Sequence, residues 1–264
     1  MAFELLVDDK ITVATTGGRP FDPTAPVVVL VHGSGMDHTV WALQSRYLAH
    51  HGRAVLAVDL PGHGRSEGDP LVSIEAIADW LIRLLDAAGV AKAALVGHSM
   101  GAIAALEAAA RHPARVCALA LCGVAPAMPV HPAMLASAEQ NGQAAIDMVN
   151  GWGHGGNAHR GGHRLPGSWM VGGGNRLLQR AHPGALYADL KACNDWQGGE
   201  AALARVVCPT LVLMGRDDKM TPAKAGLKLA AAIAGAKPVV LEGAGHMMMS
   251  EAPDATLAAL QQVL

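Results

Sequence analysis

The sequence has few charged residues and no excess of either sign. Charged side chains make up 16% of the 264 residues, and 20 basic residues stand against 22 acidic ones. Intrinsic disorder needs low hydrophobicity and high net charge, so this composition excludes it. Nucleic-acid binding needs surplus basic side chains that neutralise phosphates, and at a net charge of −2 we expect no nucleic-acid partner.

Cysteine is scarce, and continuous apolar runs long enough to span a membrane are absent. The 4 cysteines form no C-x-x-C pair and lie at no zinc-finger spacing from histidine, so we interpret them as small buried hydrophobic residues, which suits a reducing compartment. Residues 1–10 are acidic and have no basic n-region, so we expect no signal peptide. The apolar stretch of residues 116–130 is too short to span a bilayer and contains Pro126 and Pro129. We therefore expect a cytoplasmic protein without a membrane partner.

Short apolar runs alternate with helical patterns in the first half of the chain and again near its end. The expected strands are 3–7, 11–15, 27–31, 54–58, 93–96, 116–121, 209–214 and 238–241. The expected helices are 39–50, 73–88, 100–111, 222–234 and 253–264, and Ser73 is a suitable N-cap for the second. Alternation of strand and helix at this period predicts an α/β fold, with a mostly parallel sheet covered by helices on both faces.

A G-x-S-x-G string stands where a strand turns into a helix. The residues GHSMG occupy positions 97–101, between the expected strand 93–96 and the expected helix 100–111. The string alone is a weak signal, but its placement is the one that a nucleophile elbow requires, a tight turn that exposes a serine hydroxyl. Glycines flank the serine because side chains would clash in so sharp a turn. Ser99 is therefore the candidate nucleophile.

A serine hydroxyl needs a general base, and the base needs an acid that orients it. His246 directly follows the strand 238–241 and its Gly-rich loop, which makes it the candidate base. Asp217 and Asp218 follow the strand that ends at residue 214, and both are candidate acids. The order serine, aspartate, histidine is the one expected when a nucleophile elbow serves a catalytic triad on an α/β sheet.

A second glycine-rich loop can supply an oxyanion hole. The residues HGSG at 32–35 follow the strand 27–31. We expect the backbone N–H of Ser34, together with that of Met100 after the nucleophile, to face the developing oxyanion.

Residues 126–199 break the α/β alternation. They are rich in glycine, proline and histidine and show weak periodicity, so we interpret them as a lid inserted into a core of residues 1–125 and 200–264. The candidate substrate contacts are three lid aromatics, Trp152, Trp169 and Trp196, and Met247 beside the histidine. The alternative that the aromatics only pack the lid onto the core stays open.

Three histidines of the lid raise the question of a metal. His154, His159 and His163 are spaced by five and four residues, but no cysteine or carboxylate accompanies them. We interpret this stretch as a mobile glycine-rich loop and expect no metal.

Five motifs in this order resemble the α/β-hydrolase superfamily. They are HGSG at 32–35, DLPGHGRS at 59–66, GHSMG at 97–101, GRDDKMTP at 215–222 and GAGH at 243–246. The resemblance implies a doubly wound, mostly parallel sheet of eight strands with an inserted lid. In this family the acid usually stands four residues before the proline of the 215–222 loop, which favours Asp218 over Asp217.

The resemblance implies a serine hydrolase that needs no cofactor. A carboxylesterase that cleaves small to medium apolar esters through an acyl-enzyme on Ser99 is the first hypothesis. Carbon–carbon bond hydrolases of ring-fission-type diketone acids are an alternative, although they typically carry asparagine and tryptophan where this chain has His98 and Met247. A hydrolase-like small-molecule binding protein is a second alternative. The sequence does not fix the oligomeric state.

Overall fold

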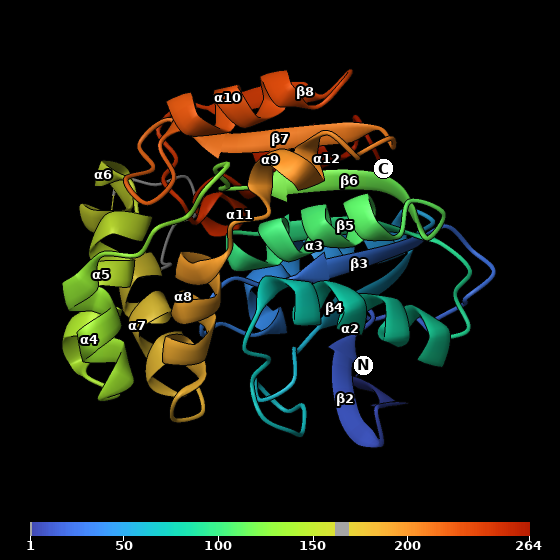
Figure 1. The fold of residues 1–264 in the computed structure, drawn as a ribbon, viewed down its shortest axis with the longest axis horizontal. Helices are drawn as coiled ribbons and strands as arrows, with labels where there is room; N and C mark the ends of the chain where they lie inside the picture. Colours follow the sequence, from blue (N-terminus) through green and yellow to red (C-terminus); the bar gives the residue numbers. More distant parts are fainter. Residues whose placement is uncertain (1, 162–168) are drawn as a thin grey trace.

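An eight-stranded sheet forms the centre of the computed structural model, which describes residues 2–161 and 169–264 (Figure 1). The strand order is β1-β2-β4-β3-β5-β6-β7-β8. The first two pairings, β1 with β2 and β2 with β4, are antiparallel, and every later neighbouring pair is parallel. The strands are β1 (Ala2–Val7), β2 (Lys10–Thr15), β3 (Val27–Val31), β4 (Ala54–Val58), β5 (Ala93–His98), β6 (Val116–Cys122), β7 (Thr210–Gly215) and β8 (Lys237–Leu241). The prediction of a doubly wound, mostly parallel sheet is confirmed.

The central strands are buried on both faces. Every residue of β3, β4, β5 and β7 is buried, because helices cover both sides of a parallel sheet and leave no face for polar side chains. Aliphatic residues fill these strands, as the continuous apolar runs predict. Polar side chains that do chemistry must therefore lie in the loops at the strand ends.

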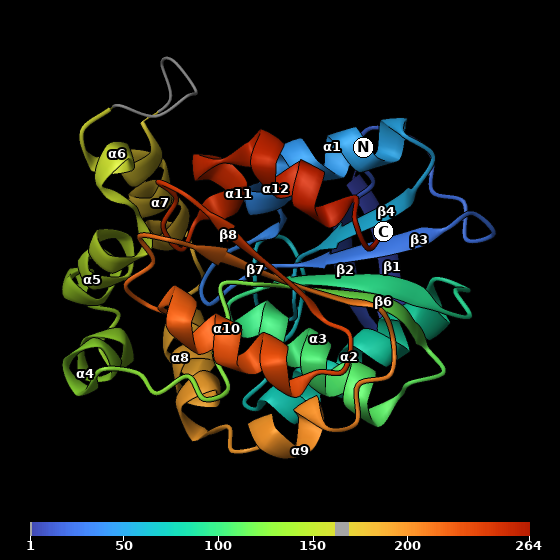
Figure 2. The same ribbon diagram turned by 90° about the horizontal axis from the view of Figure 1, so that it is seen from above.

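Helices cover the sheet on both sides. In Figure 2, α1, α11 and α12 lie on one face, while α2, α3 and α10 lie on the other. Their bounds are α1 (Ala42–His50), α2 (Ile74–Ala87), α3 (Met100–Arg111), α10 (Ala223–Ala232), α11 (Met248–Glu251) and α12 (Pro253–Leu260). The Ser73 hydroxyl accepts the N–H of Ala76 at 3.1 Å, which confirms the predicted N-cap of α2. The helix expected at 39–50 is split, because a 3₁₀ turn, η1 (His38–Trp41), precedes α1.

The chain between β6 and β7, here called the β6–β7 segment (residues 123–209), is helical in its described part despite its weak periodicity. Its helices are α4 (Pro132–Glu139), α5 (Gln143–Gly153), α6 (Gly156–His159), α7 (Met170–Gln179), α8 (Ala185–Asp195) and α9 (Gly199–Leu203). Glycines within helices, such as the three consecutive ones of α7, blur the hydrophobic pattern. In both ribbon views α4, α5, α7 and α8 stand together beside one end of the sheet (Figures 1 and 2). A lid at 126–199 stays a prediction.

The hydrophobic core forms a layer on each side of the sheet. One layer joins α2 and α3 to the strands, and the other joins α1 and α12 to them. None of the helices in residues 2–161 and 169–264 has the length and apolarity needed to cross a membrane.

Candidate active site

Ser99 occupies a strained turn between β5 and α3. Its backbone has φ 54° and ψ −116°, a conformation that L-residues rarely adopt. Its N–H donates to Cys122 O at 2.9 Å, which anchors the turn to β6. Such strain persists only where the surroundings over-determine it, as the sharp strand-to-helix turn predicted from the sequence requires.

The glycines beside Ser99 are there because backbones meet at this turn. A Cβ atom on Gly97 would lie 2.1 Å from Gly101 O, and one on Gly101 would lie 2.5 Å from His32 O. Neither contact is possible, so any larger residue would push α3 away from the sheet. The turn therefore depends on glycine at both positions.

His246 and Asp218 form a buried pair. The Nδ1–H of His246 donates to Asp218 Oδ2 at 2.7 Å, and the two side chains are 2% and 0% exposed. Asp218 Oδ1 also accepts the N–H groups of Met220 and Thr221, both at 2.8 Å. Oδ2 accepts the hydroxyl of Thr221 at 2.7 Å. The carboxylate is thereby held in one orientation.

Electrostatics keep Asp218 ionised. Burial alone would raise the pKa of this carboxyl, but the neighbouring His246 and the hydrogen bonds from Thr221 outweigh it and lower the pKa below its ordinary value. Asp217 is half-buried, and its backbone N–H donates to Ala244 O at 2.9 Å. Of the two candidate acids, the structure joins only Asp218 to the imidazole among the described residues.

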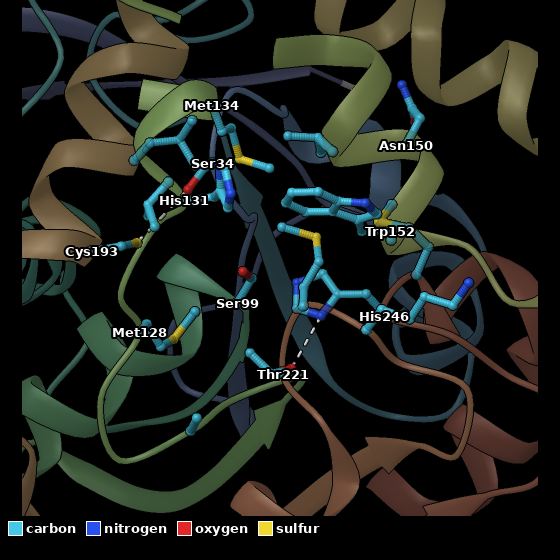
Figure 3. A pocket seen from close by; sticks show the side chains of 18 of the residues that line it. Ser34, Ser99, Met128, His131, Met134, Asn150, Trp152, Cys193, Thr221 and His246 are labelled. Atoms are coloured by element: carbon cyan, nitrogen blue, oxygen red, sulfur yellow. Dashed lines mark hydrogen bonds between the residues drawn. The ribbon is translucent and has the colours of Figure 1, made fainter. Parts of the chain in front are cut away.

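The other nitrogen of His246 has no partner in the described part of the protein. Nε2 is buried and makes no hydrogen bond, while the ring lies against Gly123, where a Cβ atom would approach it to 2.9 Å. Figure 3 shows the side chains of Ser99 and His246 entering the same cavity. An imidazole that donates through Nδ1 keeps a lone pair on Nε2 and can accept a proton there.

The predicted oxyanion donors lie beside this cavity. Ser34 lines it, and Met100 is the first residue of α3, where backbone N–H groups lack intrahelical acceptors. Neither N–H donates a hydrogen bond to any residue that the structure describes. The assignment of both groups to an oxyanion hole stays a prediction.

The cavity is mainly apolar and has a volume of about 370 Å³, which lies within the range of small-molecule sites. Trp152 and Met247, two of the candidate substrate contacts, line it, and methionine and leucine side chains form much of the remaining wall. The exposed residues of the lining mark its mouth: Ala127, Pro129, His131, Lys219 and Pro222.

Two predicted substrate contacts lie elsewhere. Trp196 is 3% exposed, directly follows α8, and packs in the core layer of α3. Trp169 is 77% exposed and borders a separate cavity. Neither lines the cavity of Ser99, so we do not retain these two as substrate contacts. Aromatic content alone does not tell which helix face a side chain occupies.

His98 was not assigned a role from the sequence. Its Nε2–H donates to the backbone oxygen of His246 at 3.0 Å, and the two rings lie 4.7 Å apart. Burial, together with the nearby His246, holds the pKa of His98 well below its ordinary value, so it is neutral. It thus steadies the backbone of the candidate base.

Glu251 is a second residue near the candidate base whose role the sequence does not indicate. Its Oε1 accepts the N–H groups of Gly245 and Met247, at 3.1 and 3.2 Å, on either side of His246. Its Oε2 accepts the N–H of Gly155 at 2.8 Å and so joins the β6–β7 segment to the histidine loop. A lone glutamate in a short amphipathic stretch carries no sequence signal for this role.

The histidines considered for a metal do not form one cluster in the described residues. His154 is buried, donates Nδ1–H to Asn150 O at 3.1 Å, and has its ring 6.3 Å from that of His159. His163 lies outside the described residues. The prediction that this stretch is a mobile glycine-rich loop is wrong for residues 156–159, which form α6.

Another group in the described residues has the spacing of metal ligands, namely Asp37, His38 and Asp59. Asp59 Oδ1 accepts both the N–H and the Nδ1–H of His38, at 2.8 and 2.7 Å. Asp37 caps η1 and pairs with Arg180. These hydrogen bonds account for the cluster as a loop anchor.

Comparison with known proteins places these features in a family. The sequence model of the alpha/beta hydrolase family matches residues 28–260. A putative carbamate hydrolase RutD of Pseudomonas savastanoi is 31% identical, over 84% of this chain and 87% of its own. A 2-hydroxy-6-oxononadienedioate/2-hydroxy-6-oxononatrienedioate hydrolase of Cupriavidus pinatubonensis is 30% identical, over 84% of this chain and 81% of its own. The crystal structure of the enol-lactonase of Burkholderia xenovorans LB400 superposes with a TM-score of 0.87 at 25% identity and covers 98% of both chains.

Proposed function

Since the chain belongs to the alpha/beta hydrolase family, we propose that it is a serine carboxylesterase that cleaves small to medium apolar esters through an acyl-enzyme on Ser99. One observation carries the proposal. The buried His246–Asp218 pair leaves Nε2 of the imidazole without a partner among residues 2–161 and 169–264, in the cavity that Ser99 enters. This arrangement can remove a proton from a serine hydroxyl, and it has no evident structural purpose.

Acylation follows from the arrangement of the three side chains. His246 Nε2 takes the hydroxyl proton of Ser99 as the serine oxygen attacks the ester carbonyl carbon. Asp218, ionised and fixed by four hydrogen bonds, holds the imidazole with Nδ1–H and stabilises the imidazolium that forms. His246 then gives the proton to the leaving alcohol oxygen.

Backbone groups supply the electrostatic part. The N–H groups of Ser34 and Met100 stabilise the negative charge on the former carbonyl oxygen, a contribution of about 3–4 kcal/mol for one such donor. Water, deprotonated by His246, then attacks the acyl carbon, and His246 gives the proton to Ser99 Oγ as the acid is released. No step needs a cofactor or a metal.

The cavity supports an apolar substrate of modest size. Its volume of about 370 Å³ is near the low end for small-molecule pockets. Trp152 and Met247 belong to its apolar wall. Relatives named as a carbamate hydrolase and an enol-lactonase share acyl transfer to water, and this chemistry is compatible with an ester substrate.

The test is hydrolysis of p-nitrophenyl esters from acetyl to palmitoyl by the wild type and by Ser99→Ala. We expect rapid turnover of short chains, a decline at long chains, and loss of turnover in Ser99→Ala. A fluorophosphonate probe should label the wild type and not the variant. Fast hydrolysis by Ser99→Ala would refute the proposal.

Two other outcomes point to other functions. Labelling of Ser99 without ester turnover, together with cleavage of a vinylogous diketone acid, would indicate a carbon–carbon bond hydrolase, which the relative from Cupriavidus pinatubonensis is named as. His98 and Met247 stand where those enzymes typically carry asparagine and tryptophan, so we place this function second. Labelling with no turnover of either substrate would indicate a binding protein.

A further inference from the structure

One face of α8 packs against the loop that holds the proposed oxyanion donor Ser34. Leu186, Asp189 and Cys193 are three and four residues apart, a spacing that places them on one side of the helix. A Cβ atom on Gly35 would lie 2.9 Å from Leu186 Cδ1. The thiol of Cys193 lies 3.8 Å from the Ser34 hydroxyl (Figure 3).

The loop itself is a tight turn. The N–H of Met36 donates to Gly33 O at 3.1 Å, and Gly35 has a φ of +67°, as the third residue of a type II turn requires. In such a turn the central peptide, here between Ser34 and Gly35, can flip at little cost to the flanking residues. What holds that peptide therefore fixes the conformation of the turn that carries the N–H of Ser34.

Asp189 holds it. Its Oδ2 accepts the N–H of Gly35 at 2.8 Å and also the Nε2–H of His63 at 2.9 Å, and the carboxylate and imidazole are each 1% exposed. The other ring nitrogen of His63 lies 3.0 Å from Pro61 O. Both ring nitrogens thus face oxygen acceptors, an arrangement that favours the doubly protonated, cationic ring.

The charge on the His63 ring affects the electrostatics of the neighbouring oxyanion hole. Burial disfavours the charged form of His63, but Asp189 and the hydrogen bonds outweigh burial and raise the pKa of His63 above its ordinary value. The positive charge of this form of His63 offsets the negative charge of a carboxylate beside it. A buried carboxylate without its cation would oppose the negative charge that develops in the oxyanion hole.

We propose that Asp189, from the β6–β7 segment, is a positioning residue for the oxyanion hole, because it fixes the Ser34–Gly35 peptide while His63 balances its charge. The proposal rests on the proposed ester hydrolysis and deepens it. It assigns the β6–β7 segment a part in transition-state stabilisation in addition to lining the cavity.

The experiment compares Asp189→Ala, Asp189→Asn and the matched control Asp195→Ala. Asp195 is on the same helix, is exposed, and pairs with Lys191 away from the cavity. Each protein is assayed with p-nitrophenyl butyrate for kcat and KM. The dissociation constant of an alkyl trifluoromethyl ketone is measured as well, because its adduct with Ser99 places an oxyanion in the hole.

We expect Asp189→Ala to lower kcat about 100-fold, the loss typical of an active-site group misplaced by about 1 Å. Affinity for the trifluoromethyl ketone should fall by a similar factor, while KM changes less than about threefold, since the peptide acts on the transition state. Asp189→Asn keeps an oxygen for the Gly35 N–H and should retain kcat within about fivefold. Asp195→Ala should match the wild type.

A kcat of Asp189→Ala within threefold of the Asp195→Ala value would overturn the proposal, as would a change confined to KM. If Asp189→Ala does not fold, the NMR chemical shift of the Gly35 amide proton in Asp189→Asn tests the proposal instead. Its resonance must move upfield in Asp189→Asn and stay in place in Asp195→Asn, and an unmoved resonance refutes the role. Failure of the wild type to hydrolyse any ester would instead count against the proposed function.

Discussion

Replacing Asp218 with asparagine should abolish most activity, because the surrounding hydrogen bonds dictate how the new amide must lie. Oδ1 of Asp218 faces two N–H donors, those of Met220 and Thr221, both at 2.8 Å. The asparagine oxygen must take that position, because an NH₂ group there would oppose two donors. The NH₂ group is then directed at His246 Nδ1, which lies 2.7 Å from the present Oδ2. His246 must accept there, and its proton moves to Nε2.

An imidazole with a proton on Nε2 cannot take the proton of Ser99. The same substitution in a well-studied serine protease triad lowers kcat by about 10⁴, which corresponds to roughly 5.4 kcal/mol of transition-state stabilisation at 1.36 kcal/mol per tenfold change. We expect a loss of that size for Asp218→Asn, measured with p-nitrophenyl butyrate at neutral pH. Asp217→Asn is the matched control and should change kcat less than about threefold, since this side chain makes no hydrogen bond to His246 within the described chain.

The melting temperature and near-UV spectrum of Asp218→Asn establish that the variant is folded before its kinetics are interpreted. A folded Asp218→Asn with more than a tenth of wild-type kcat would refute the assignment of the acid. A large loss in Asp217→Asn with little loss in Asp218→Asn would transfer the role to the neighbouring residue.

Three further predictions concern residues around the site. Glu251→Gln keeps an oxygen for the N–H groups of Gly245 and Met247 but turns its NH₂ group against the N–H of Gly155. The link between the β6–β7 segment and the loop of the candidate base is then lost, so kcat should fall about tenfold with little change in KM. Glu242→Gln, an exposed position in the loop before His246, should not change kcat, and equal values for both variants would count against this role. The pKa of His63 is higher in the folded than in the unfolded protein, so its pairing with Asp189 stabilises the fold below about pH 6.5 and ceases to do so as the pH rises through the folded value. His63→Gln should therefore flatten the fall in unfolding free energy above that pH in urea titrations, and an unchanged slope would contradict the pairing. Lys219 is the lysine in the described lining of the cavity. Lys219→Met should therefore raise KM for an anionic p-nitrophenyl hemisuccinate by about threefold relative to a neutral ester. Equal KM changes for both esters would show that the Lys219 side chain does not contact the anionic group of the substrate.

The positions of the candidate triad could be picked out from the sequence because backbone contacts dictate the glycine-rich turns that carry them. A Cβ atom on Gly97 or Gly101 would clash with backbone, so this turn needs glycine on either side of Ser99. The choice between Asp217 and Asp218 rested on the distance to a proline and not on chemistry. The structure supplies the chemical reason, since the N–H groups of the 218–221 turn face Asp218.

The sequence was much less informative about the β6–β7 segment. Small residues and glycines inside its helices weaken the periodicity, so helix faces were not identifiable and Trp196 was assigned to the cavity although it packs in the core. Asp189 looks in sequence like an ordinary polar residue of a helix. Its partners, Gly35 and His63, are 154 and 126 residues away, and only the folded chain brings the three together.

The most direct test of the central claim is to trap the acyl-enzyme. The protein is mixed with a p-nitrophenyl ester, quenched in acid within milliseconds, digested, and analysed by mass spectrometry. We predict a burst of p-nitrophenol close to one equivalent per active site and an acyl group on the peptide that contains Ser99. Steady turnover with no acyl group on any serine, or an acyl group on a residue other than Ser99, would contradict the account.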